Sequence, residues 1–231
     1  MFRRAHPEHA VPTNPGVVEC YPGVRLVLTE PIPADAVEPA RKRLRAAAED
    51  LDDQRIAALV RDLAAAAGVA VAWEQVCVPL LATLRGDGAA EIAVEHALAE
   101  GIRVGLDVFR REPGRPLAAD GVLLAGAEQE THCLGLHALA AALRERGRGC
   151  LHLGPALPWT ALAGAVAQVR PRVVVVWSQS PATGRAHRLT RLRRDFPGVR
   201  LHAAGPGWIE PVAPPAVRLG SLAEATAACL V

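Results

Sequence analysis

The run Glu130-Thr131-His132-Cys133-Leu134-Gly135 has the residue types and spacing of a metal-binding loop. A carboxylate two residues before a histidine can hydrogen-bond one ring nitrogen and leave the other free to bind a metal ion. A glycine where a helix is expected to begin leaves room for a bulky group to approach the backbone. A lone histidine at such a turn is more often a solvated loop residue, so the rest of the chain must decide between the two interpretations.

Small or polar residues follow three of the predicted strands. The histidine loop follows 121–125, Ser178-Gln179-Ser180 follows 173–177, and Gly205 and Gly207 follow 199–203. In a doubly wound parallel sheet, ligands bind outside the carboxyl ends of the strands, at the switch point in strand order. These loops are therefore expected to meet at one ligand site. The simpler alternatives are an ordinary polar strand exit at Ser178 and a tight turn at Gly205.

Three parts of the chain must position these loops. Residues 1–33 are rich in Pro and Gly without a helical period, which predicts an irregular arm. Residues 34–112 predict a helical bundle, and alternating strands and helices over 117–231 predict a parallel sheet. The predicted bundle helices are 34–49, 52–67, 69–84 and 89–111, and the predicted linker is 112–116. The fold class is α/β: a small four-helix bundle followed by a flavodoxin- or Rossmann-like parallel five-stranded sheet with helices on both faces.

Taken together, these motifs resemble the cobalamin (vitamin B12)-binding module. Its signature is Asp-x-His-x-x-Gly, then Ser-x-Leu after a later strand, then a Gly-Gly pair. In this chain Glu130 takes the Asp position, as in light-sensing B12-dependent repressors of the MerR type, and Ser180 replaces the Leu. The glycine pair is spread over Gly205 and Gly207. The resemblance runs from about residue 33 to the C-terminus.

The resemblance implies a bound adenosyl-, methyl- or hydroxocobalamin, whose cobalt has His132 as its lower axial ligand. The displaced nucleotide tail of the cofactor would lie in a groove of small side chains beside the sheet. The helical bundle would cover the upper face of the cofactor. The implied cofactor-binding residues are Glu130, Thr131, His132, Gly135, Ser178, Ser180, Gly205 and Gly207 in the α/β domain, with Glu95 and His96 in the bundle.

Glu95 and His96 match a Glu-His pair of the light-sensing family, in which the His can replace the upper ligand after illumination. Neighbouring helical residues diverge by about 100°, so we expect His96 rather than Glu95 to face the cobalt. In that family a Trp ten residues before the Glu covers the upper ligand, and here that position is Arg85. Trp73 is assigned to the bundle core. A polar helix edge is the simpler alternative for the pair.

Composition restricts the remaining functions. A formal net charge of +2 gives no polyanion-binding signal, and five scattered cysteines form neither a disulfide framework nor a zinc pattern. Apolar runs fall short of the ~20 residues that span a bilayer, and the first residues lack the apolar core of a signal peptide. A cytoplasmic protein without membrane attachment is expected. The arm is too short for a helix-turn-helix, so direct DNA binding is not expected.

Two functions from different classes follow. The first is a sensory or regulatory cobalamin-binding protein, with a response to light as one form. It would act through a protein partner such as a transcription regulator, or through homo-oligomerisation, and would not be an enzyme. The alternative is a corrinoid carrier for a methyltransferase, although Gly135-Leu136-His137 departs from the Gly-Lys-Asn helix start usual in carriers. A bare interaction module that has lost the cofactor is a third, outlying reading.

Overall fold

The computed structural model describes residues 17–21, 24–27, 33–84, 86, 88–111, 117–214 and 216–230. The chain divides into two units, Met1–Pro31 and Ile32–Val231. In the first unit, β1 (Val17–Tyr21) pairs antiparallel with β2 (Val24–Val27). A hairpin therefore lies within the segment predicted to be an irregular arm. That prediction rested on the missing helical period, whereas β-branched valines favour strands.

The second unit begins with helices that occupy the predicted bundle segments. They are α1 (Ala34–Glu49), α2 (Asp53–Ala67), α3 (Val69–Val71), the π-helical segment η1 (Ala72–Cys77), α4 (Val78–Thr83) and α5 (Ala89–Val108). Asp52 starts α2 by accepting a hydrogen bond from the backbone N–H of Arg55. The elements α3, η1 and α4 follow one another along the predicted helix 69–84, so the π turn is the one feature of this segment that the helical period did not predict.

The π turn has a local cause in Pro79. A proline has no N–H, so the carbonyl of Gln75, four residues earlier, cannot receive the usual helical hydrogen bond. Arg41 of α1 supplies the missing donors, with Nε and Nη2 at 3.1 and 2.6 Å from the Gln75 oxygen. The irregular turn is therefore joined to the first helix, and Trp73 and Glu74 lie within it.

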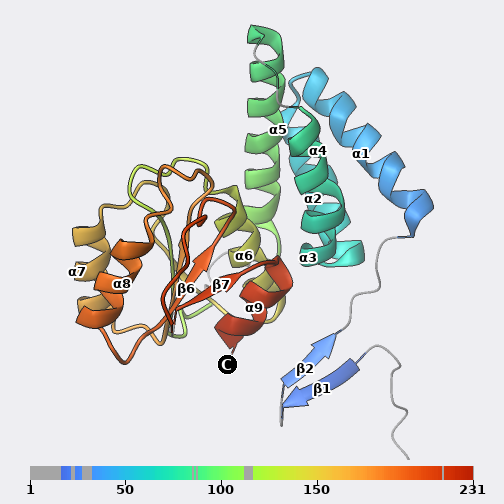
Figure 1. Cartoon of the computed structure of the whole chain (residues 1–231). Helices are drawn as coiled ribbons and strands as arrows, with labels where there is room; N and C mark the ends of the chain where they lie inside the picture. The colour runs from blue at the N-terminus through green and yellow to red at the C-terminus, as the bar shows by residue number, and fades with distance from the viewer. Residues whose placement is uncertain are drawn as a thin grey trace, which may run out of the picture. The chain divides into compact units, whose positions relative to one another are not determined.

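Two glycines bring α5 against α2. A Cβ on Gly101 would lie 2.5 Å from Cβ of Ile56, and one on Gly105 would lie 2.7 Å from the carbonyl oxygen of Ala57. Side chains at these positions would force the helices apart. This close packing holds α5, the helix that carries Glu95 and His96, in place (Figure 1).

The rest of the unit is a five-stranded parallel sheet in the order β4-β3-β5-β6-β7. Its strands are β3 (Val122–Gly126), β4 (Leu151–His152), β5 (Val173–Trp177), β6 (Arg200–Ala204) and β7 (Val217–Leu219), and its helices are α6 (Leu134–Glu145), α7 (Trp159–Val169), α8 (Ala186–Asp195) and α9 (Leu222–Leu230). The helices α6 and α9 share one apolar core with the sheet, and α7 and α8 share another. Helices therefore cover both faces, and the predicted fold class is confirmed.

The bundle and the sheet, with a predicted linker at 112–116, pack against each other within the second unit. One continuous apolar core includes buried residues of α1, α2, α5 and α6. Long-range caps join the parts as well: Glu145 accepts from the backbone N–H of Val69, and Glu74 accepts from that of Leu222. The predicted linker 112–116 lies outside the described residues. Within the ranges given above, no helix is long and apolar enough to cross a bilayer.

Candidate functional site

The site lies where the strand order reverses. After β3 the chain passes through α6 to the edge strand β4, and then crosses back through α7 to β5 on the other side of β3. The loops after β3 and β5 therefore leave neighbouring strands in opposite directions. Such a switch point is where doubly wound sheets bind ligands. The sequence predicted both loops correctly, with Glu130 and His132 in the first and Ser178 in the second.

Glu130 joins these two loops through buried hydrogen bonds. Its side chain is 1% exposed. Oε1 accepts from the backbone N–H of His132 at 2.8 Å. Oε2 accepts from the backbone N–H groups of Gln179 and Ser180 and from the hydroxyl of Thr183, at 2.8, 3.0 and 2.6 Å. Burial alone would raise the pKa of this carboxyl, but the hydrogen bonds from Thr183, Ser180, His132 and Gln179 outweigh it and lower the pKa. Glu130 is therefore held as a carboxylate.

The His132 ring is held at one nitrogen and open at the other. Nδ1 lies 3.3 Å from Oε1 of Glu130 and 3.4 Å from the hydroxyl of Thr131. The side chain is nevertheless 77% exposed, and the residue lines a large cavity. A ring that donates from Nδ1 to a carboxylate keeps its lone pair on Nε2, which is the arrangement of a metal-ligating histidine.

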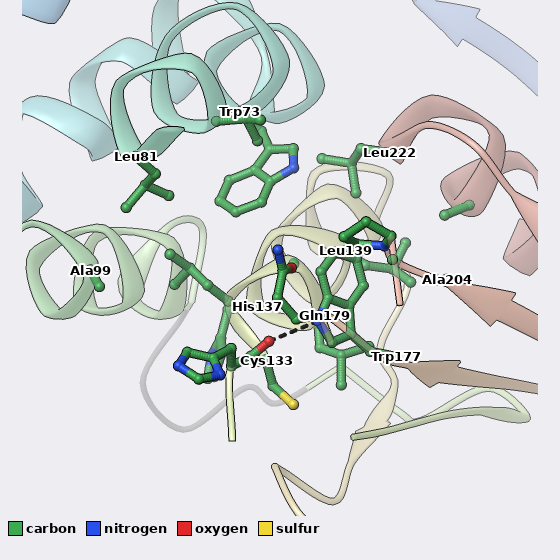
Figure 2. Close-up of a pocket in the computed structure, with 18 of the residues that line it drawn as sticks. Trp73, Leu81, Ala99, Cys133, His137, Leu139, Trp177, Gln179, Ala204 and Leu222 are labelled. Atoms are coloured by element: carbon green, nitrogen blue, oxygen red, sulfur yellow. Dashed lines mark hydrogen bonds between the residues drawn. The ribbon is translucent and has the colours of Figure 1, made fainter. Parts of the chain in front are cut away.

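The cavity has a volume of about 1160 Å³ and lies between the helical bundle and the carboxyl ends of the strands. Figure 2 shows Trp73 and Leu81 on the bundle side, and Trp177 and Ala204 on the side of the sheet. Leu139 and Leu222 line it as well, so much of the wall is apolar. Its volume exceeds the roughly 300–1000 Å³ of pockets for drug-sized molecules, so it suits a larger ligand.

Both members of the Glu95–His96 pair line this cavity. His96 is exposed and Glu95 is half-buried. α5 runs along the wall and presents both residues to this wide space, so the expectation that His96 rather than Glu95 faces a cobalt stays a prediction. Arg85, at the position of the expected Trp, lies outside the described residues.

The remaining predicted site residues fall into two groups. Thr131, Gly135 and Gly205 line the cavity together with His132, whereas Glu130, Ser178, Ser180 and Gly207 do not belong to its lining. The hydroxyl of Ser178 is fully buried, and is 2.9 Å from the carbonyl of Ser180 and 2.7 Å from the hydroxyl of Thr183. It therefore supports the β5 loop from within. Whether any of these residues touches a cofactor remains a prediction.

Trp73, which the sequence assigned to the bundle core, packs against that core without being fully buried in it. It is half-buried, lines the cavity, and comes from the π-helical segment (Figure 2). An inserted residue in a helix changes the direction of the side chains around it, and π turns are frequent at functional sites. Pro79 was a signal in the sequence that this helix could not be regular.

His137 was given no role, yet it too lines the cavity and links the two halves of the unit. Its Nδ1 lies 2.9 Å from Oδ1 of Asp107 in α5, and Oδ2 of Asp107 lies 2.9 Å from Nη1 of Arg103. Burial acts to raise the pKa of Asp107, but hydrogen bonding and the positive charges nearby lower it. Behind this pair, the His152 ring meets that of His137 edge to face, 4.7 Å between centroids.

The donor set indicates what kind of metal could be held. Within the part of the chain that the structure describes, no group of three or more His, Cys, Asp or Glu side chains could hold an ion. Structural and catalytic zinc sites need three or four protein ligands. A single oriented imidazole in a large apolar cavity therefore suits a metal that arrives with its own ring of ligands, inside an organic cofactor.

Comparison with known proteins gives a fold but no family. No family model and no curated protein matches the chain. Among solved structures, a cobalamin-binding protein from Desulfitobacterium hafniense is 15% identical, with a TM-score of 0.41 over 81% of this chain and 95% of that one. The methanol:cobalamin methyltransferase complex from Methanosarcina barkeri is also 15% identical, with a TM-score of 0.41 over 86% of this chain and 80% of that one.

A third structure gives a better superposition. It is the monomethylamine corrinoid protein of Methanosarcina barkeri, with a TM-score of 0.55 at 17% identity. The match covers 84% of this chain and 98% of that one, so it includes both the helices and the sheet. The chain thus has the fold of that corrinoid protein: an N-terminal helical part followed by a five-stranded, all-parallel sheet with helices.

Proposed function

We propose that this chain binds a corrinoid such as cobalamin, with His132 as the lower cobalt ligand, and carries it for a methyltransferase partner. The observation that carries the proposal is the pairing of Glu130 with His132 at the mouth of the cavity. One nitrogen of the ring faces a buried carboxylate and the other is free. A cobalt held in a corrin ring needs one imidazole from the protein rather than a cage of ligands.

The roles of the chain's residues follow from their positions. Glu130 keeps the His132 ring in the tautomer whose free lone pair is on Nε2. The apolar side chains of Trp73, Leu139 and Leu222 exclude water from the face of the cavity they line. When bound, the cofactor would supply a cobalt that takes a methyl group from a donor and gives it to an acceptor. We assign activation of donor and acceptor to the partner, and no catalytic residue to this chain.

The carrier function is favoured over the sensory one for two reasons. The fold match above is to a corrinoid protein. The objection from the helix start is also weaker, since Leu136 and His137 have packing roles. Leu136 is fully buried in the core shared with the bundle, and His137 bonds to Asp107.

The test is to mix the purified protein with hydroxocobalamin, remove free ligand, and record the absorbance spectrum. Retained corrinoid with the spectrum of a histidine-ligated cobalt is expected. His132→Ala should weaken retention about 10- to 100-fold or more, since even partners of a ligating His cost that much. His187→Ala, in α8 and away from the cavity, is the control. Unchanged retention and spectrum in His132→Ala would refute the assignment.

A light-responsive sensor is the second candidate, because Glu95 and His96 both line the cavity. If this candidate holds, green light on the adenosylcobalamin-loaded protein changes its spectrum, and His96→Ala alters the photoproduct. A complex whose spectrum does not change in light supports the carrier function and rules out the light-sensing function. The partner in that case would be a regulatory protein or a second copy of the chain.

A further inference from the structure

The indole of Trp177 fills the space between two of the glycines predicted to form a groove. A Cβ on Gly135 would lie under 3.0 Å from three carbons of the six-membered ring of the indole. A Cβ on Gly205 would first meet the carbonyl oxygen of Ser178, and would lie 3.1 Å from Cδ2 of the same indole. The room expected beside Gly135 for a ligand is therefore taken by a side chain of this chain. The earlier expectation of an open path at Gly135 is corrected accordingly.

The sheet fixes the backbone of Trp177, whereas its indole packs against the core at the cavity wall and makes a hydrogen bond there. The residue ends β5 in register with Gly126 and Ala204, and its carbonyl accepts from the N–H of Ala127. The indole is half-buried and lines the cavity, and its Nε1 donates to the carbonyl of His132 at 2.8 Å (Figure 2). A side chain at a cavity wall can change rotamer without moving the sheet beneath it.

We propose that Trp177 is a plug that closes an extension of the cavity between Gly135 and Gly205. The extension holds a flat aromatic ring against glycine backbone, so the occupant that replaces the indole is another flat aromatic group. This step rests on the proposed function: the occupant is the aromatic base on the nucleotide tail of the corrinoid. A corrinoid without that tail needs no displacement of Trp177, whereas one with the tail must turn the indole out.

Moving the indole out of this space also changes a contact of the loop after β3, which carries His132. The N–H of the indole donates to the carbonyl of His132, the residue whose ring faces the cavity. Filling the extension thus frees the backbone of the proposed cobalt ligand. Binding of the nucleotide tail is therefore coupled to the position of the His132 backbone through this hydrogen bond.

The experiment compares the affinities for hydroxocobalamin and for cobinamide, which lacks the nucleotide tail. The two affinities are measured by absorbance titration in the wild-type protein, Trp177→Ala, Trp177→Leu and Trp177→Phe. The tail of free hydroxocobalamin competes for its own cobalt, so the ratio in one protein is not diagnostic. Comparing this affinity ratio between a variant and the wild-type protein isolates the contribution of the Trp177 side chain. Trp177→Leu is the test should Trp177→Ala not fold.

We expect Trp177→Ala and Trp177→Leu to shift the ratio toward hydroxocobalamin by about tenfold or more, the equivalent of one net hydrogen bond and its packing. Trp177→Phe, which keeps a ring but loses the N–H, should stay closer to the wild type. A ratio unchanged in both small variants would overturn the plug while leaving cobalamin binding intact. Retention of neither corrinoid by the wild-type protein would overturn the proposed function, and the plug with it.

Discussion

Oε1 of Glu130 lies 2.8 Å from the backbone nitrogen of His132 and 3.3 Å from Nδ1 of the same residue. The other oxygen, Oε2, accepts hydrogen bonds from the loop after β5. One carboxylate thus fixes both the orientation of a candidate metal ligand and the distance between the two loops at the switch point. The Glu130 side chain thus makes both a local contact within its own loop and long-range contacts with the loop after β5.

Glu130→Gln tests this double role. The amide cannot accept at both ends, so buried N–H or hydroxyl donors lose their partner, at a cost of about 1–3 kcal/mol in unfolding free energy. Corrinoid retention should fall about 10- to 100-fold because the His132 ring is no longer oriented. Chemical denaturation and hydroxocobalamin titration measure the two effects. Glu128→Gln, a half-buried residue of the same loop, is the matched control. Equal losses of stability and of hydroxocobalamin affinity in the two variants would contradict this role of Glu130.

The same carboxylate predicts a pH dependence. Because the pKa of Glu130 is lowered in the folded protein, its stabilising contribution is present above the ordinary carboxyl value of 4.5. It is lost as the pH falls through the lower, folded pKa, since the unfolded chain then binds the proton first. The loss of stability below pH 4.5 should therefore be shallower in Glu130→Gln than in the wild type. Urea midpoints at several pH values, with Glu128→Gln beside them, give the comparison.

His152 should make the protein less stable in mild acid. Burial, followed by the neighbouring His137, lowers its pKa from 6.5 to about 4, and its buried Nε2 has no hydrogen-bond partner among the residues that the structure describes. Between those values the unfolded chain binds a proton that the folded one does not, so stability falls as the pH drops from 6.5 to 4. His152→Phe, which keeps a ring against His137, should reduce this slope by up to about 1.4 kcal/mol per pH unit.

Urea unfolding between pH 7 and pH 4 measures that slope. His202 has a pKa lowered by burial as well, so part of the slope should persist in His152→Phe. The prediction fails if the variant and the wild type lose stability in parallel over this range.

Gly135 and Gly164 should respond to alanine in opposite directions. A Cβ on Gly135 collides with the indole of Trp177, so Gly135→Ala should destabilise by about 1–3 kcal/mol. A Cβ on Gly164, within α7, meets nothing within 4 Å, so Gly164→Ala should stabilise by about 0.5–1 kcal/mol through helix propensity. Thermal or urea unfolding of the two variants measures these changes in stability. Adding Trp177→Leu to Gly135→Ala should recover part of the loss, and a purely additive double variant would speak against the collision.

Trp73 and Trp159 provide a matched pair of tryptophans on different sides of the sheet. Trp73 lines the cavity, whereas Trp159 is buried with α7 and α8 in the other core. Trp73→Ala should weaken corrinoid binding with a modest loss of stability. Trp159→Ala should cost about 3–5 kcal/mol of stability and leave the affinity of the folded protein unchanged. Titration together with unfolding separates the two, and an unaltered affinity in Trp73→Ala would remove it from the site.

By itself, the sequence determined the elements and the chemistry of the histidine loop. Helical spacing in 34–111 and short apolar runs in 121–219 are local signals, and they predicted the bundle and the parallel sheet with small errors at the ends. The Glu130–His132 spacing predicted a local hydrogen bond that the structure confirms. Parallel strands also place their carboxyl ends together, which explains why His132 and Ser178 could be expected at one edge without coordinates.

Only the tertiary structure decided which side chains face the cavity. Gly135 gave the same sequence signal whether its space was for a ligand or for Trp177, because a missing Cβ does not say what fills the gap. Trp73 comes to the wall in a π turn that Pro79 favours locally and that Arg41 of α1 completes, and His137 is held there by Asp107 of α5. Side-chain direction at such positions depends on long-range packing, and local patterns in the sequence carry no record of it.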